Sequence, residues 1–190
     1  MPLIGSPNIA PEPAPTPEDA LAAPCPDVLT LRGISRVEHH YHEIDADFEF
    51  LSAPTAPIVC TAWDYFHQHV ARHGRFLKNA LSLRDAAPFA HSLWMVEYKP
   101  DEDAFFVRLW SSGATELIGA NLTGHKVPED GPVGKWPMLY RKVMKSDKPV
   151  VLRNKMSESE KDFLITEVAV LPLHHKAGGV RYMLCPFALV

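Results

Sequence analysis

Residues 105–124 read FFVRLWSSGATELIGANLTG and contain a strand pattern, a short helix pattern and a glycine-closed turn. Side chains over residues 105–110 alternate with the period of two that is typical of a strand, with apolar residues on both faces. Ser111 or Ser112 can cap the helix, and Gly119 can end it because glycine adopts the left-handed conformation at low cost. The stretch therefore predicts one wall of a small pocket.

Further strand patterns on both sides of this stretch predict an antiparallel sheet. Residues 92–98 and 104–110 are joined by a polar, proline-led turn, which favours a hairpin. A helix pattern at residues 138–145 precedes three more strands, of which the second is long and apolar and is expected near the centre of the sheet. These three strands cover residues 150–156, 163–173 and 180–189. The order predicts an α+β fold, a five-stranded antiparallel sheet with short helices on one face.

An amphipathic helix is predicted at residues 64–74, before the sheet. Thr61, with an acidic residue three positions later, fits a capping box at its start. Trp63, Phe66 and Val70 recur on one apolar face of this helix. Because the helix precedes the main fold, this face is expected to contact a partner or a second copy of the chain.

The chain divides into four regions. Residues 1–26 are rich in proline and predict an extended, unstructured tail. Residues 27–60 form a lead-in segment, residues 61–89 the N-terminal helix and a connector, and residues 90–190 the folded core.

The lead-in segment contains His39, His40 and His42 beside several carboxylates. These residue types bind metals, but their spacing matches no closed metal site. A solvated polar segment is the preferred interpretation, so no metal site is predicted. A metal-dependent enzyme using the three histidines is kept as the weaker alternative.

Composition excludes several classes of protein. The chain has 190 residues and a net charge of −4, with lysine and arginine scattered, so nucleic-acid binding is not expected. Its three cysteines, Cys25, Cys60 and Cys185, have no CxxC spacing, which suits a reducing compartment, and Cys185 is expected to be buried in an apolar strand. No signal peptide or membrane-spanning run is found, so the expected location is the cytoplasm, without membrane insertion.

The motifs resemble those of the PAS fold, and in particular a bacterial PAS-like family. That family carries Arg-Leu-x-Gly-Thr, Glu-Leu-x-Gly and Asp-Leu-Thr-Gly, and this chain has Arg108-Leu109, Glu116–Gly119 and Asn121–Gly124 at those places. Leu171–Leu173 matches a late Leu-Pro-Leu of such domains. The chain departs from the pattern at Ser111-Ser112 and at Asn121, which preserve capping and turn chemistry. The resemblance covers residues 66–190.

The resemblance implies a sensory or regulatory module and not an enzyme. Its expected action is to transmit a signal by binding another protein, such as a two-component signalling partner, and a homodimer is also expected. The alternative is a sensor whose bound small molecule controls partner binding. The cofactor is left unknown, although flavin photochemistry is not expected because residues 119–122 lack the cysteine that light-sensing relatives use.

Candidate pocket residues are mainly aromatic, with Arg108 and Glu116 as groups that could orient a ligand. Ordinary core or surface positions are the alternative for each of them, and no catalytic residue is predicted. The candidates are Trp94, Phe106, Arg108, Trp110, Glu116, Leu117, Trp136, Tyr140 and Tyr182.

Overall fold

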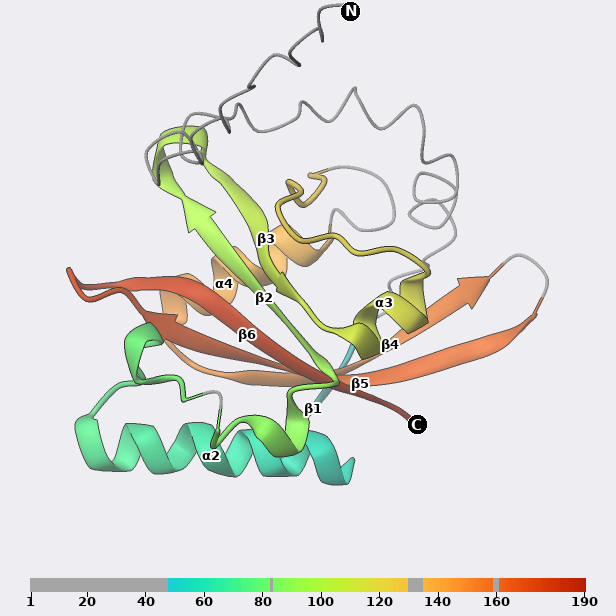
Figure 1. Ribbon diagram of the computed structural model, residues 1–190, viewed down its shortest axis with the longest axis horizontal. Helices are drawn as coiled ribbons and strands as arrows, with labels where there is room; N and C mark the ends of the chain where they lie inside the picture. The colour runs from blue at the N-terminus through green and yellow to red at the C-terminus, as the bar shows by residue number, and fades with distance from the viewer. Residues whose placement is uncertain (1–47, 83, 130–134, 159–160) are drawn as a thin grey trace, which may run out of the picture.

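The computed structural model describes residues 48–82, 84–129, 135–158 and 161–190. These residues form a single antiparallel sheet. Its strands are β1 (Phe48–Leu51), β2 (Leu93–Lys99), β3 (Ala104–Trp110), β4 (Val150–Glu158), β5 (Lys161–His174) and β6 (Val180–Leu189). The order across the sheet is β1-β4-β5-β6-β2-β3 (Figure 1).

Helices cover both faces of this sheet (Figure 1). The helix α2 lies on one face, and α3 and α4 lie on the other. The α-helices are α2 (Pro57–His73), α3 (Ser112–Ile118) and α4 (Lys135–Ser146), and the short 3-10 turns are η2 (Lys78–Ala80), η3 (Ala87–Phe89) and η4 (Pro100–Glu102). None of the described helices is both long and apolar enough to cross a membrane.

The predicted α+β class and antiparallel sheet are confirmed, including the β2–β3 hairpin and the central position of β5. The prediction of five strands was wrong, because β1 adds a sixth. β1 pairs with the outer edge of β4, where Phe48 lies opposite Asn154. Its four residues are too few to show a convincing alternation in the sequence, so only the exposed edge of β4 makes this segment a strand.

The N-terminal helix begins earlier than predicted, at Pro57, and ends at the left-handed Gly74. The predicted capping box was wrong. Thr61 lies inside the helix, where its hydroxyl donates to the Pro57 carbonyl oxygen over 2.9 Å, and the N-cap residue Ala56 provides no side-chain bond. A proline is well accepted in the first turn, so its presence marks the true start.

The apolar side of α2 packs against the sheet in what we call the α2-face core. Phe66 is buried there beside Val59 and Phe76. Trp63 and Val70 are half-buried and pack against the same core. The face that was expected to contact a partner therefore contacts the chain's own sheet, because burying it there removes its apolar surface from water.

The opposite side of the sheet carries what we call the α3/α4-face core. β5 supplies residues to both cores by simple alternation. Val168 and Val170 face α3 and α4, whereas Ala169 and Leu171 face α2. α4 contributes its buried side, including Val143, to the α3/α4-face core.

The edge of the sheet at β3 is covered by residues 124–127. The Gly124 amide donates to the Val107 carbonyl oxygen over 2.7 Å, and the Val127 amide donates to the Phe105 carbonyl oxygen over 2.8 Å. This edge is therefore already paired within the chain, which protects it from pairing with another molecule.

Several predictions fall on residues outside the described ranges. They are the proline-rich tail at residues 1–26, the first part of the lead-in segment, the His39, His40 and His42 cluster, and Cys25. Among the described residues, no group of three or more histidine, cysteine or acidic side chains could hold a metal ion.

Candidate functional site

Helix α3 is fixed to the start of β2 by its capping residue. The Ser111 hydroxyl oxygen accepts hydrogen bonds from the Ala114 amide, as predicted for an N-cap, and from the Leu93 amide, each over 3.2 Å. Gly119 ends the helix in the left-handed conformation with a φ of 80°, also as predicted. The strand, helix and turn of the opening stretch are therefore confirmed.

Gly113 allows a close backbone contact under α3. Its amide donates to the His91 carbonyl oxygen over 3.0 Å. A Cβ at this position would lie 2.5 Å from that oxygen, closer than any real contact. The glycine is therefore required for α3 to rest directly on the chain that leads into β2.

A cavity of ≈ 90 Å³ lies between the sheet and this part of the chain. Its walls come from β2, β3, β4, β5, α3, α4 and the segment after α3. The lining residues are Trp94, Val96, Val107, Trp110, Ala114, Leu117, Ile118, Leu122, Val127, Trp136, Tyr140, Asn154 and Thr166. Most of them are apolar or aromatic, which is typical of a small-molecule site.

Five of the predicted pocket residues line this cavity. They are Trp94, Trp110, Leu117, Trp136 and Tyr140. The remaining four lie elsewhere. Phe106 is buried beneath the Lys99 ammonium group, which is 3.9 Å from the ring centre. Glu116 is exposed, with its carboxylate 3.8 Å from the His91 ring.

Arg108 and Tyr182 meet at a different place, around Glu97. The Arg108 Nε lies 3.1 Å from the Glu97 carboxylate, and the Tyr182 hydroxyl donates to it over 3.0 Å. Burial, together with the bond to this carboxylate, raises the pKa of Tyr182. The side chains therefore satisfy one another at the sheet surface and do not orient groups in the cavity.

Aromatic rings form one end of the cavity. The Trp94 indole N–H donates to the Tyr140 hydroxyl oxygen over 3.1 Å, which satisfies both groups. The Trp136 ring stands edge-on to Trp94 at 5.5 Å between ring centres. Behind them, Cys185 is fully buried, as expected, and burial raises the pKa of its thiol well above the usual range. This end is therefore rigid and already hydrogen-bonded.

Two polar atoms in the cavity wall have no hydrogen-bond partner among the described residues. They are the Asn154 Oδ1 acceptor and the Trp110 Nε1–H donor, both shielded from solvent. Asn154 is only 3% exposed. The hydroxyl of the neighbouring Thr166 donates to the Asn154 backbone oxygen over 3.3 Å and not to the Asn154 side-chain oxygen. Buried polar atoms are nearly always paired in native proteins. Five buried side-chain atoms among the described residues lack a hydrogen bond, and two of them, in Arg153 and Arg181, lie at ion-pair distance from carboxylates. Of the five, only the atoms of Asn154 and Trp110 line the cavity, and they require an explanation.

Sequence reasoning missed Asn154 and Thr166. A usable signal was present, because the alternation along each strand places both residues on the same side as the buried residues Leu152 and Val168. A polar residue at an inward strand position is unusual and often marks a site.

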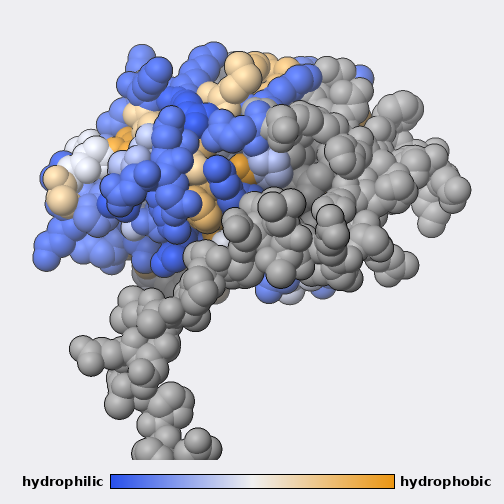
Figure 2. Space-filling model, turned by 90° about the horizontal axis from the view of Figure 1, so that it is seen from above, coloured by the Kyte–Doolittle hydropathy of each residue, from blue (hydrophilic) through white to orange (hydrophobic). Residues whose placement is uncertain are grey.

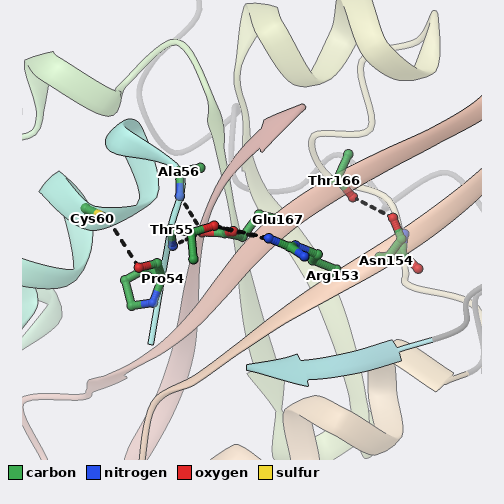
Figure 3. A network of polar contacts seen from close by, with 8 residues as sticks. All are labelled: Pro54, Thr55, Ala56, Cys60, Arg153, Asn154, Thr166 and Glu167. Atoms are coloured by element: carbon green, nitrogen blue, oxygen red, sulfur yellow. Dashed lines mark hydrogen bonds and ion pairs between the residues drawn. The ribbon is translucent and has the colours of Figure 1, made fainter. Parts of the chain in front are cut away.

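On the opposite face, the same two strands hold a buried carboxylate. Glu167 is 0% exposed, and one of its oxygens accepts hydrogen bonds from the Thr55 amide over 2.6 Å and the Ala56 amide over 2.8 Å (Figure 3). The Thr55 hydroxyl donates to the second oxygen. Glu167 thus anchors the two residues that lead into α2, whose N-cap residue Ala56 provides no side-chain bond of its own.

Arg153 completes this arrangement, which we call the Glu167 junction. Its Nε lies 3.9 Å from the carboxylate, and its Nη2 donates to the Thr55 hydroxyl oxygen over 3.3 Å. Burial alone would raise the pKa of Glu167, but the bonds from Thr55 and Ala56 and the Arg153 charge outweigh it and lower this pKa. The carboxylate is therefore ionised at neutral pH, and both of its oxygens accept hydrogen bonds.

The cavity and the Glu167 junction are adjacent through the sheet. Arg153 lies opposite Glu167 in the β4–β5 pair, and the next pair along is Asn154 opposite Thr166. Figure 3 shows the two pairs side by side on the strands, with the junction meeting the start of α2. One pair lines the cavity, and the other holds the residues that lead into α2.

Comparisons with known proteins give only distant similarity. No protein-family model matches the sequence, and a search of curated proteins finds no match. An RNA-binding light-oxygen-voltage receptor is similar with a TM-score of 0.42 and 11% identity, over 77% of this chain and 39% of the receptor. The chain thus spans much less than two thirds of that protein's length.

Two further structures are similar at the same level. A fungal LOV-domain photoreceptor has a TM-score of 0.40 and 16% identity, over 68% of this chain and 94% of its own. A sensory box histidine kinase/response regulator from Burkholderia thailandensis E264 has a TM-score of 0.35 and 13% identity, over 57% of this chain and 85% of its own. At these scores, the light sensing, RNA binding and kinase functions belong to those proteins alone.

Proposed function

We propose that the chain is a PAS-type sensory or regulatory module in which a small molecule in the cavity changes how α2 is held. The observation that carries this proposal is the pairing of Asn154–Thr166 on the cavity side with Arg153–Glu167 on the helix side. Of the two versions considered from the sequence, the cavity favours the one in which a bound ligand is the signal.

The contact between β4 and β5 provides a route by which a bound ligand can affect α2. A ligand that contacts Asn154 or Thr166 can shift β4 against β5 only by moving the neighbouring pair as well. The Glu167 carboxylate accepts two backbone amides at the start of α2, so small displacements change these bonds. The ligand must bind the two arrangements with different affinity for any signal to result.

The role is proposed to be non-enzymatic. The cavity offers an amide, a hydroxyl and indole and phenol groups, which suit recognition more than proton transfer. The recipient of the signal is proposed to be a signalling protein or a second copy of the chain. Figure 2 shows one face on which hydrophilic residues predominate in the described part, so a polar contact fits that face.

Xenon is a suitable first probe, because it enters apolar cavities without needing hydrogen bonds. The full chain, labelled with ¹⁵N, is studied by NMR under increasing xenon pressure. We expect saturable shifts at Asn154 and Thr166, accompanied by shifts of the Thr55 and Ala56 amides on the opposite face. In the matched variant Glu167→Gln, the chemical-shift changes at Asn154 and Thr166 should remain, and most of those at Thr55 and Ala56 should disappear.

Two results would count against the proposal. Absence of saturable xenon shifts at the cavity would remove the ligand site. Cavity shifts without any response at Thr55 and Ala56 would remove the proposed coupling. Size-exclusion chromatography and pull-downs with extract of the source cell then test the recipient, with recovery of a defined signalling protein as the expected result.

A further inference from the structure

The two unpartnered polar atoms in the cavity wall define what its ligand must offer. Asn154 Oδ1 is an acceptor and needs a donor, whereas Trp110 Nε1–H is a donor and needs an acceptor. The remaining polar side chains that approach the cavity are engaged elsewhere: Tyr140 accepts from Trp94, and Thr166 donates to a backbone oxygen.

Leaving both atoms unpaired in an apolar cavity is costly, because each has lost its hydrogen bonds with water. A folded core normally avoids unpaired polar atoms by placing an apolar side chain, such as leucine or phenylalanine, at an inward strand position. The presence of one donor and one acceptor in the same cavity wall therefore indicates a recognition role and not a packing role.

Size and shape restrict the ligand further. The cavity measures ≈ 90 Å³, below the roughly 150 Å³ of an engineered apolar cavity that admits benzene. Trp94, Trp110 and Trp136 supply flat walls on which a planar ring can pack or meet an edge. Val107, Leu122 and similar side chains close the rest of the surface without polar groups.

We infer that the cavity binds a compact, uncharged, planar molecule of about five ring atoms that carries one N–H or O–H donor and one acceptor. The donor bonds to Asn154 Oδ1 and the acceptor receives the Trp110 indole proton. A charged ligand is excluded, because none of the described residues that line the cavity is charged and could pair with it. This inference rests on the proposed function, which supplies the cavity as the input site.

Pyrazole is the test probe, since its five-membered ring carries both an N–H donor and a ring nitrogen acceptor. Pyrrole, which has only the donor, and cyclopentane, which has neither, are the matched probes. Affinities are measured by NMR titration of the ¹⁵N-labelled full chain, following the indole N–H signals. We expect pyrazole to bind at least about tenfold more tightly than either matched probe, since each added hydrogen bond in a dry site contributes about that factor.

Two variants each remove one of the two polar groups, and cyclopentane binding controls for the change in wall shape that accompanies the loss. Asn154→Leu removes the acceptor, and Trp110→Phe removes the indole N–H. Each should weaken pyrazole binding by about tenfold and leave cyclopentane binding within about threefold of the original. Trp63→Phe, in the α2-face core away from the cavity, is the matched control and should change neither affinity. Having two independent variants keeps the test decisive if one of them folds poorly.

The outcomes separate this inference from the proposed function. If all three probes bind equally well, or if neither variant weakens pyrazole, the ligand class is wrong while the cavity remains the input site. If xenon also fails to enter, both the ligand class and the input site are rejected. Preferential pyrazole binding that depends on Asn154 and Trp110 supports both.

Discussion

The two faces of the β4–β5 pair solve the problem of buried polar groups in opposite ways. On the α2 side, the Glu167 carboxylate is fully buried and accepts hydrogen bonds from two backbone amides and a hydroxyl, with the Arg153 guanidinium at ion-pair distance. On the other side, Asn154 Oδ1 is buried beside a cavity without any partner among the described residues. Both sites lie on β4 and β5, and they differ only in the face of the sheet on which they lie.

This difference separates stability from recognition. A satisfied buried carboxylate fixes the position of α2, so its value lies in holding the fold together. An unsatisfied amide beside empty space weakens the fold slightly and is retained where something else can complete it. The Glu167 junction is therefore expected to be sensitive to substitution in the free protein, and the cavity wall to be tolerant until a ligand is present.

The largest effect is expected from Glu167→Ala, which removes the carboxylate of the Glu167 junction. It leaves the buried Ala56 amide, the Thr55 amide and the half-buried Arg153 guanidinium without the carboxylate, so we expect the free energy of unfolding to fall by about 3 kcal/mol. Urea denaturation followed by circular dichroism measures this. Glu49→Ala, at an exposed position of β1, is the control and should stay within about 0.5 kcal/mol. A loss no larger than that of the control would show that the junction does not hold α2.

A smaller loss is expected from Gly113→Ala, which disturbs the helix that covers the cavity. The new Cβ would lie 2.5 Å from the His91 carbonyl oxygen, so α3 must move away from β2. We expect a loss of about 2 kcal/mol in spite of the better helix propensity of alanine, together with weaker pyrazole binding. Glu116→Ala on the exposed side of α3 should change neither quantity. A stabilised Gly113→Ala protein would contradict the close contact.

A paired substitution compares the packing of the two faces directly. Val107→Ile adds one methylene group beside the cavity, and Val59→Ile adds one inside the α2-face core. We expect the first to stabilise by up to about 0.8 kcal/mol and the second to destabilise by about 1 kcal/mol. Both are measured by thermal and urea unfolding. Equal losses in the two variants would indicate that the cavity is not available space.

The smallest effect concerns pH. The pKa of Glu167 is lowered in the folded protein, so its contribution to stability is present above the pKa of about 4.3 that an unfolded glutamate has. This contribution is lost as the pH falls through the lower folded value. The stability difference between the wild type and Glu167→Gln should therefore be constant at neutral pH and shrink as acid is added below that point. A difference that grows in acid would mean that the folded carboxyl is protonated.

Much of the fold follows from local patterns. The alternation at β2, β3, β5 and β6 and the turns between them are readable because side-chain direction along a strand depends only on the positions of neighbours in the sequence. The cap at Ser111 and the end of α3 at Gly119 follow for the same reason. Aromatic or apolar character also pointed to five of the cavity residues.

Other features required the chain to be folded. Ala56 and Glu167 are 111 positions apart, so no local signal could replace the mistaken cap at Thr61. β1 exists because the edge of β4 is available to it, and Asn154 lines the cavity because β3, α3 and α4 close over it. The sequence alone determined most of the strands and helices, apart from β1 and the start of α2, since these elements depend on short-range periodicity. The tertiary structure alone decided which polar groups are satisfied and which are left open, since that depends on partners brought together from distant parts of the chain.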